Sequence, residues 1–319
     1  MAFYWVVSLS VVFLNKYIFR YALFSPAAPL LTRTLSSSEN KFPYPLFVTW
    51  YQIFVALVLL VVCGWLGQFW RPLSMIPPMT LTRHTSSQIM PLTLLYVGML
   101  GTNNLCLQYV EVSFYQVARS LSIVFNIIFT YTVLGQKTSS PAIMSCVIIF
   151  IGFVLGSYGE MNFSWEGVVY GVAASCFVAL YGIFVKKKLA VVQDNEWVLL
   201  QYNTALATVV LLPIVYASGE FAFLSDPEVA HLLTNWSFWL VMTITAITGF
   251  LINIAIFLQI KVTTSLTNTI SGTAKACVQS LLGWLVFRNV ITPLNLTGIL
   301  LSLAGSALYS WVRFREMRR

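Results

Sequence analysis

The strongest constraint on this chain is a series of apolar runs, each long enough to cross a lipid bilayer, that recurs along its whole length. A membrane-spanning helix needs about 20 consecutive apolar residues. Backbone N–H and C=O groups have no water to bind in hydrocarbon, so each run must satisfy them internally as a helix. The sequence therefore predicts an all-α integral membrane protein.

Charge content supports this class. Only 9% of the 319 residues are charged and 58% are hydrophobic, whereas a soluble domain carries about 25% charged residues. The basic residues behind the net charge of +8 follow the loops and do not form a basic patch interleaved with aromatic side chains. We expect one membrane domain, residues 1–319, with the lipid bilayer as its surroundings and no nucleic acid as a partner.

Ten runs qualify as spans, and they divide into two groups of five. The first group covers residues 2–22, 45–66, 89–110, 113–134 and 141–158, and the second covers 165–185, 197–217, 238–258, 264–287 and 293–312. Because five is an odd number of crossings, the second group must insert upside down relative to the first. The predicted fold is ten transmembrane helices built as two inverted five-helix repeats, residues 1–160 and 161–319, an arrangement typical of alternating-access carriers.

The loops on the two sides of the membrane differ in charge. Most Lys and Arg residues outside the spans fall on one side, including residues 186–188 and Arg313, and such residues are retained in the cytosol. Both termini are therefore predicted to be cytosolic. The opposite side holds most acidic residues and the glycosylation sequons at Asn162, Asn235 and Asn295, as expected of a lumenal face, although Asn295 lies too near a span to be a good acceptor.

Two spans carry matched polar stripes. One stripe consists of Tyr115, Arg119, Ser122, Asn126 and Thr130, and the other of Thr264, Asn268, Ser271, Lys275 and Gln279. Both advance by four, three, four and four residues, which keeps each stripe on one helix face. Single polar residues often only join membrane helices, but a full positive charge in each stripe favours a solute site.

Lys16, Arg119 and Lys275 are the ionised side chains expected inside the membrane, and every Asp and Glu is expected in a loop or tail. A charge near the bilayer centre costs at least about 2.5–3.5 kcal/mol, so a substrate is the best source of the counter-ion. Lys16 and Arg119 lie toward span ends, from which long side chains can reach the interface, whereas Lys275 lies near mid-span. Arg and Lys are both common phosphate ligands, so the solute is expected to be a phosphorylated anion.

A proton relay is not expected, because His84 and His231 lie in loops along with the carboxylates. The sequence thus predicts exchange of one solute for another. Its cysteines lie inside apolar runs as small buried hydrophobes, and neither a cofactor nor a metal site is indicated.

Five short segments are distinctive: Val-Phe-Leu-Asn-Lys-Tyr at 12–17, Asn-Asn-Leu-Cys-Leu at 103–107, Arg-Ser-Leu at 119–121, Ser-Gly-Thr-Ala-Lys-Ala-Cys at 271–277 and Trp-Val-Arg at 311–313. Through these segments nearly the whole chain resembles the nucleotide-sugar transporters of the drug/metabolite transporter superfamily, and within them the GDP-fucose transporter family. The resemblance implies a Golgi membrane protein that imports GDP-fucose in exchange for GMP.

The resemblance also implies roles for individual residues. In relatives that carry GDP-sugars, a Phe-Tyr-Asn-Asn motif reads guanine, and a Gly-Ala-Leu-Asn-Lys motif meets the phosphates and sugar. Residues 201–204, Gln-Tyr-Asn-Thr, and residues 272–275, Gly-Thr-Ala-Lys, look like these motifs, with Gln201 and Thr204 departing from the pattern. The candidate substrate-binding residues are Lys275, Arg119, Lys16, Tyr202, Asn203, Asn103, Asn104, Ser271, Gly272, Thr273, Asn268, Tyr51 and Gln52.

Other interpretations stay open at this point. The nearest is an exchanger of the same architecture for GDP-mannose or a sugar phosphate. A membrane enzyme would need a general base or a metal-binding carboxylate within the spans, and a purely structural membrane protein would have no use for internal cations. The oligomeric state is not determined, and a homodimer is one of the assemblies left open.

Overall fold

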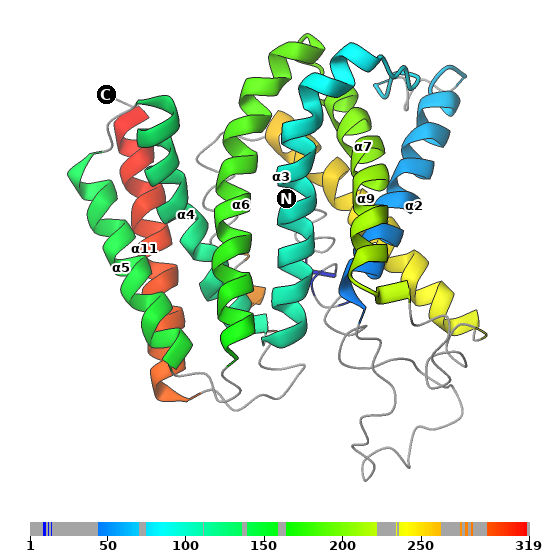
Figure 1. The fold of residues 1–319 in the computed structure, drawn as a ribbon. Helices are drawn as coiled ribbons and strands as arrows, with labels where there is room; N and C mark the ends of the chain where they lie inside the picture. The colour runs from blue at the N-terminus through cyan, green and yellow to red at the C-terminus, as the bar shows by residue number, and fades with distance from the viewer. Residues whose placement is uncertain are drawn as a thin grey trace. The chain divides into compact units, whose positions relative to one another are not determined.

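The computed structural model describes residues 9–10, 12, 14, 44–69, 75–110, 112–135, 139–158, 164–221, 234, 236–262, 275, 278–279, 282 and 292–317. Its helices are α2 (Pro45–Leu66), α3 (Arg83–Tyr109), α4 (Val112–Leu134), α5 (Ser140–Tyr158), α6 (Trp165–Leu189), the short 3₁₀ helix η3 (Ala190–Val192), α7 (Glu196–Ala217), α9 (Trp236–Val262) and α11 (Pro293–Met317) (Figure 1). Within these described ranges no β-strand occurs.

Six of the described helices are long and apolar enough to cross a membrane, namely α2, α3, α5, α6 continued by η3, α7 and α11. Helix α4 has a comparable length of 23 residues, but its polar stripe makes it less apolar. The protein is therefore an all-helical, multi-pass membrane protein. The ten-helix inverted repeat stays a prediction, because the expected spans 2–22 and 264–287 lie largely outside the described residues.

Helix boundaries follow the predicted spans, and several helices extend a few residues beyond them. Helix α2 coincides with the predicted span 45–66, whereas α3 begins earlier than predicted, at Arg83. Glu166 and Glu196 lie in the first turns of α6 and α7, where a loop position was expected. A helix N-terminus favours a negative charge, so both glutamates suit these positions.

Contacts divide the chain into two compact units. Unit 1 comprises residues 1–9, 98–187 and 253–319, and unit 2 comprises residues 10–97 and 188–252. Each unit takes residues from both predicted repeats, 1–160 and 161–319, and the repeat assignment itself stays a prediction.

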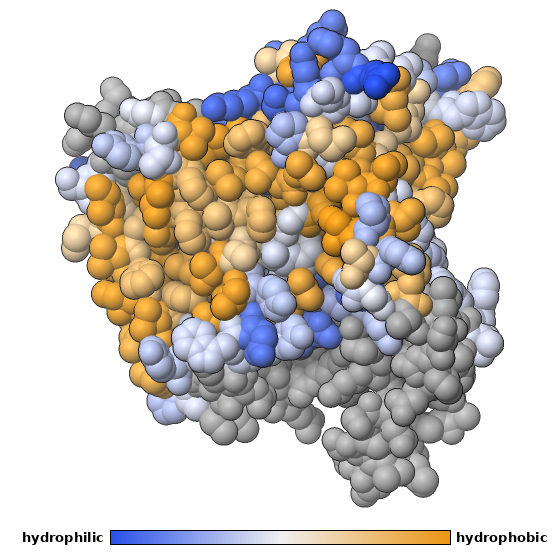
Figure 2. Space-filling view, viewed as in Figure 1, coloured by the Kyte–Doolittle hydropathy of each residue, from blue (hydrophilic) through white to orange (hydrophobic). Residues whose placement is uncertain are grey.

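In unit 1, α5 and α11 pack against each other through small residues. A Cβ added to Gly152 would lie 2.6 Å from the backbone nitrogen of Ser302 and 2.8 Å from the carbonyl oxygen of Gly298. Such close approach is how membrane helices gain van der Waals contact where lipid provides no hydrophobic driving force. Both helices also expose large apolar side chains, including Phe150 of α5 and Leu300 of α11. Figure 2 shows a largely hydrophobic surface at the left of the view.

Asn295 of α11 is part of the same packing. Its side chain is only 3% exposed, and its Nδ2 donates a hydrogen bond of 3.0 Å to the carbonyl oxygen of Gly156. A buried amide in this position cannot receive a glycan. The other sequons, at Asn162 and Asn235, lie outside the described residues.

Helix α6 packs on α4 and on the part of α3 that belongs to unit 1. Gly171 lies against Ala118 and Cys106, and the Ser175 hydroxyl donates a hydrogen bond of 2.6 Å to the Ala118 carbonyl oxygen. Cys106 is buried, and its thiol donates to the Gly167 carbonyl oxygen at 3.6 Å. These contacts hold α4, the helix that carries Arg119, closely against small residues of α6.

In unit 2, α2 and α7 lie against each other, and a residue just beyond α7 caps the N-terminus of α2. The Glu220 carboxylate, just beyond α7, accepts hydrogen bonds from the backbone N–H groups of Leu46, at 3.2 Å, and Phe47, at 2.7 Å. These N–H groups lie in the first turn of α2, where a helix leaves its donors unsatisfied. At the other end of α7, the Asn195 side chain accepts from the N–H groups of Trp197 and Val198.

We expect the Glu220 cap to make stability pH-dependent. Burial raises the pKa of the Glu220 carboxyl, while its bonds to Phe47 and Leu46 oppose the rise. A raised folded-state pKa means that stability is gained as the pH falls through it and lost as the pH rises. Wild type should therefore gain melting temperature relative to Glu220→Gln as the pH is lowered in detergent. A difference in melting temperature between wild type and Glu220→Gln that does not change with pH would contradict this role of Glu220.

Candidate functional site

The structure distributes the predicted site residues over both units. Unit 1 holds Asn103, Asn104, Arg119 and Lys275, and unit 2 holds Tyr51, Gln52, Tyr202 and Asn203. The remaining candidates, Lys16, Asn268, Ser271, Gly272 and Thr273, lie outside the described residues and stay predictions.

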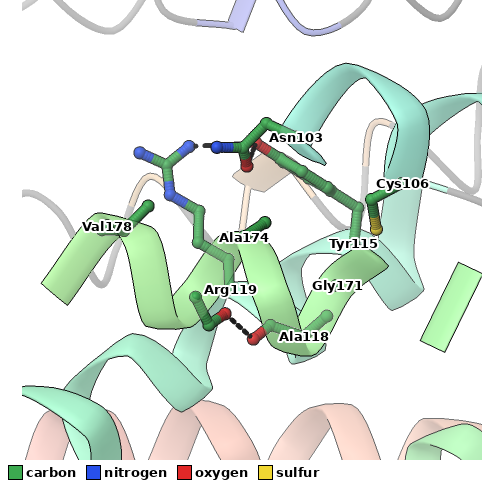
Figure 3. Close-up of a pocket in the computed structure, with 9 residues that line it drawn as sticks. Asn103, Cys106, Tyr115, Ala118, Arg119, Gly171, Ala174 and Val178 are labelled. Atoms are coloured by element: carbon green, nitrogen blue, oxygen red, sulfur yellow. Dashed lines mark hydrogen bonds between the residues drawn. The ribbon is translucent and has the colours of Figure 1, made fainter. Parts of the chain in front are cut away.

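Arg119 is the end of a hydrogen-bonded chain that links α4 to α3. Its guanidinium donates to the Tyr115 hydroxyl at 3.3 Å, and that hydroxyl donates to Oδ1 of Asn103 at 3.0 Å (Figure 3). Asn103 in turn donates from Nδ2 to the Met99 carbonyl oxygen at 2.7 Å. Tyr115 and Arg119 are one helical turn apart, so their side chains can meet on one helix face. Because the Tyr115 hydroxyl is uncharged, this hydrogen bond orients the guanidinium without neutralising its charge.

Small side chains of α6 lie beside these hydrogen-bonded residues. A pocket is lined by Asn103, Tyr115 and Arg119 together with Gly171, Ala174, Ser175 and Val178 of α6. In Figure 3 the guanidinium extends past Ala174 toward Val178 and away from the α4 backbone. Arg119 is exposed while Tyr115 is buried, so the charge is presented at the surface of this pocket.

Lys275 is the second cation of unit 1, and it is only 9% exposed. The positive charges of Arg119 and Lys275 are close enough to act on each other. The acidic side chains described in unit 1 are engaged elsewhere, Glu166 with Ser164 and Glu316 with Ser139 and Arg313. Two like charges held together in this way are stabilised by binding an anion.

Gln279 follows Lys275 by one helical turn. It is 1% exposed, and its Nε2 has no hydrogen-bond partner among the residues that the structure describes. The polar stripe had placed Gln279 on the face of Lys275, but its role as an available buried donor depends on burial and could not be predicted.

In unit 2, Asn203 of α7 is a buried amide without a hydrogen-bond partner among the residues that the structure describes. Its side chain is 1% exposed, and neither Oδ1 nor Nδ2 has a hydrogen-bond partner within the described part of the chain. A buried polar group left unsatisfied costs about 1–3 kcal/mol. Such a group marks a position where a ligand can supply the missing partners.

The neighbours of Asn203 are tied to the segment that precedes α3. Nε2 of Gln201 donates to the Pro77 carbonyl oxygen at 2.7 Å, and the Tyr202 hydroxyl accepts from the backbone N–H of Thr82 at 2.9 Å. Gln201, which departs from the family motif, therefore has a structural partner. Sequence reasoning could not find these bonds, since each joins residues more than 100 positions apart.

Tyr51 and Gln52 of α2 were predicted from their resemblance to residues 201–203. The Tyr51 hydroxyl is 2.9 Å from that of Thr243, and its ring centroid is 5.7 Å from that of Trp239, so Tyr51 contacts α9. Gln52 is half-buried. Asn104, beside Asn103, is buried.

Within the described ranges no His, Cys, Asp or Glu cluster could hold a metal ion.

Comparisons with known proteins agree on one family. The chain matches the Triose-phosphate Transporter family over residues 1–310. It is 46% identical over 318 residues to GDP-fucose transporter 1 of Dictyostelium discoideum, covering 100% of this chain and 81% of that protein. It is 36% identical over 321 residues to a Drosophila melanogaster protein named "GDP-fucose transporter, Golgi", covering 99% of this chain and 89% of that protein.

A solved crystal structure shows the same fold at low sequence similarity. It aligns with a TM-score of 0.51 over 98% of each chain at 14% identity, a likeness that concerns the fold alone. The family match and the full-length relatives, which are named transporters, exclude the membrane-enzyme interpretation. The chain is therefore a membrane transporter that belongs to the Triose-phosphate Transporter family.

Proposed function

We propose that the protein is a nucleotide-sugar antiporter of the Golgi membrane that imports GDP-fucose into the lumen in exchange for GMP by alternating access. The single observation that carries the proposal is the cation pair of unit 1, Arg119 and the buried Lys275. The two relatives described above, which match over the full length of this chain, are both named for GDP-fucose, and the name of the Drosophila melanogaster protein adds the Golgi.

The chemistry of the pair suits a diphosphate. Arg offers a planar fork of donors and Lys a compact charge, and both bind phosphate oxygens. A solute whose negative charge neutralises both cations relieves their mutual repulsion. The same need applies to the exported nucleotide, which favours exchange over one-way transport and makes GMP a suitable counter-solute.

Guanine recognition is assigned to Asn203 and Tyr202. An amide presents a donor and an acceptor side by side, which can pair with the ring edge of guanine, and Asn203 has both available. An aromatic ring such as Tyr202 can stack on a base. Asn103, Asn104 and Ser271 are proposed for the sugar, and both termini are proposed to lie in the cytosol.

The main rival is exchange of another phosphorylated solute, GDP-mannose or a sugar phosphate, which the family name supports. The test is uptake of labelled GDP-fucose into liposomes that hold the purified protein, preloaded with GMP or with buffer. Faster uptake after GMP loading supports exchange. Uptake driven by a pH gradient without any internal nucleotide would contradict it, and uptake of a sugar phosphate that GMP does not inhibit would favour the rival.

Tyr115→Phe should weaken binding moderately. The change removes the hydroxyl that accepts from Arg119 and donates to Asn103, while the ring and its packing stay. Loss of one such hydrogen bond is worth about 0.5–1.5 kcal/mol, so KM should rise by roughly two- to tenfold. Uptake kinetics would measure this, with Tyr131→Phe, at an exposed position further along α4, as the control. An unchanged KM would show that the chain does not orient Arg119 for the solute.

A further inference from the structure

Unit 1 contains a second cavity that the sequence did not predict. It is a groove of about 580 Å³ between α4, α6 and the end of α11. Small-molecule sites in proteins usually measure roughly 300–1,000 Å³, so the groove can hold a nucleotide-sized solute. The helices α4, α6 and α11 all run toward this end of unit 1, where their C-termini lie.

Cations gather at the mouth of the groove. Its lining includes Lys186 and Lys187 near the end of α6 and Arg313 near the end of α11. Arg313 forms an ion pair of 3.0 Å with Glu316. No carboxylate among the described residues lies within ion-pair distance of either lysine, so the mouth has a net positive charge.

One wall of the groove is the continuation of the polar stripe of α4. Ser122, Asn126 and Thr130 line it, and none has a hydrogen-bond partner among the residues that the structure describes. Asn126 is exposed although it lies well inside a membrane helix. A polar side chain in that position avoids lipid by facing a water-filled cavity, which fits a wall that a hydrated solute passes.

The groove leads toward Arg119. Val178 lines both the groove and the narrow pocket beside Arg119, so the groove and this pocket adjoin each other. Ser122 follows Arg119 by about one helical turn, and at 1.5 Å per residue the distance along α4 from Thr130 to Arg119 is about 16 Å. Polar groups therefore occur at every turn between the cationic mouth and the cation pair.

Retention of Lys and Arg on the cytosolic side and their preference for helix C-termini explain why cations occur at this end. These two tendencies do not explain a groove of this size. Nor do they explain why Ser122, Asn126 and Thr130, which line it, have no hydrogen-bond partner among the described residues. We propose that the groove is the entry path of the phosphorylated nucleotide, with Lys186, Lys187 and Arg313 capturing its phosphates before they reach Arg119. This inference rests on the proposed function, and it adds the residues that select for the anion on entry.

The experiment compares the double variant Lys186→Ala/Lys187→Ala with Lys188→Ala. Lys188 is the next residue of α6 and carries the same charge, but it does not line the groove. Uptake is measured in liposomes sorted for an outward C-terminal tail, which lies at the same end of unit 1 as the groove. Cationic clefts raise encounter rates by about 10- to 1,000-fold, so the double variant should raise KM about tenfold or more.

Further measurements separate electrostatic capture from a folding defect. The maximal rate at saturating solute should be unchanged, and the rise of KM with salt should flatten in the double variant, since salt screens exposed charges. Lys186→Arg/Lys187→Arg keeps the charges and should behave as wild type. Lys188→Ala should keep the wild-type KM and salt dependence.

The outcomes distinguish this inference from the proposed function. Binding of inorganic pyrophosphate can be measured in detergent by the rise in melting temperature that it causes. This binding should be weaker in the double variant even if GDP-fucose proves to be the wrong solute. Normal wild-type uptake with unchanged KM and pyrophosphate binding in the double variant would overturn the groove alone. A defect seen only in liposomes with phosphatidylserine, and absent in pure phosphatidylcholine, would mean that the lysines hold a lipid headgroup and would overturn it as well.

Discussion

Lys275→Met should abolish GDP-fucose uptake while leaving the protein folded. Met keeps the length and apolar stem of the side chain but removes the buried positive charge that we assign to the phosphates. Truncating one partner of a buried charge pair costs about 2–5 kcal/mol, which reduces binding by roughly 30-fold to several thousand-fold. The measurement is the initial rate of uptake into liposomes preloaded with GMP.

Stability should change in the opposite direction to uptake. Without solute, Lys275 and Arg119 repel each other, so Lys275→Met should unfold at the same temperature as wild type or higher. Lys275→Arg keeps the charge and should retain measurable uptake with a higher KM. Uptake at the wild-type rate by Lys275→Met would remove the central residue of the proposed function.

Asn203→Leu should separate stability from base recognition even more clearly. Leu has a similar volume and needs no hydrogen bonds, so it removes the unsatisfied amide, which costs about 1–3 kcal/mol in the empty protein. The melting temperature should therefore rise or stay constant. Inhibition of uptake by GMP should weaken by about tenfold or more, because the partners of the guanine edge are lost.

Gln201→Leu is the matched control one position earlier on α7. Gln201 is as buried as Asn203, but its Nε2 already binds the Pro77 carbonyl oxygen. Its replacement should lower the melting temperature and leave the preference for GMP over AMP unchanged. If Asn203→Leu is instead destabilised and keeps that preference, Asn203 has a structural role and guanine is read elsewhere.

Local physics made the helices predictable. A run of apolar residues such as 45–66 must become a helix in lipid whatever its neighbours do, since its hydrogen bonds are all internal. The spacing of Tyr115 and Arg119 likewise placed them on one face from sequence alone. Arg119 and Lys275 could be selected as candidates in the same way, because a cationic residue within an apolar run is visible in the sequence.

Partners distant along the chain were not predictable. Nothing in the sequence indicates that Gln201 binds Pro77, 124 positions away, or that Asn203 beside it binds nothing among the described residues. The groove lined by Lys186 and Lys187 could not be predicted either, because a groove forms only where separate helices leave space between them. The sequence by itself determined that this chain is a helical membrane protein with internal positive charge, because both properties depend on residue type and local spacing. Only the tertiary structure decided which polar groups are already satisfied and which are available to a solute, because that depends on contacts between helices.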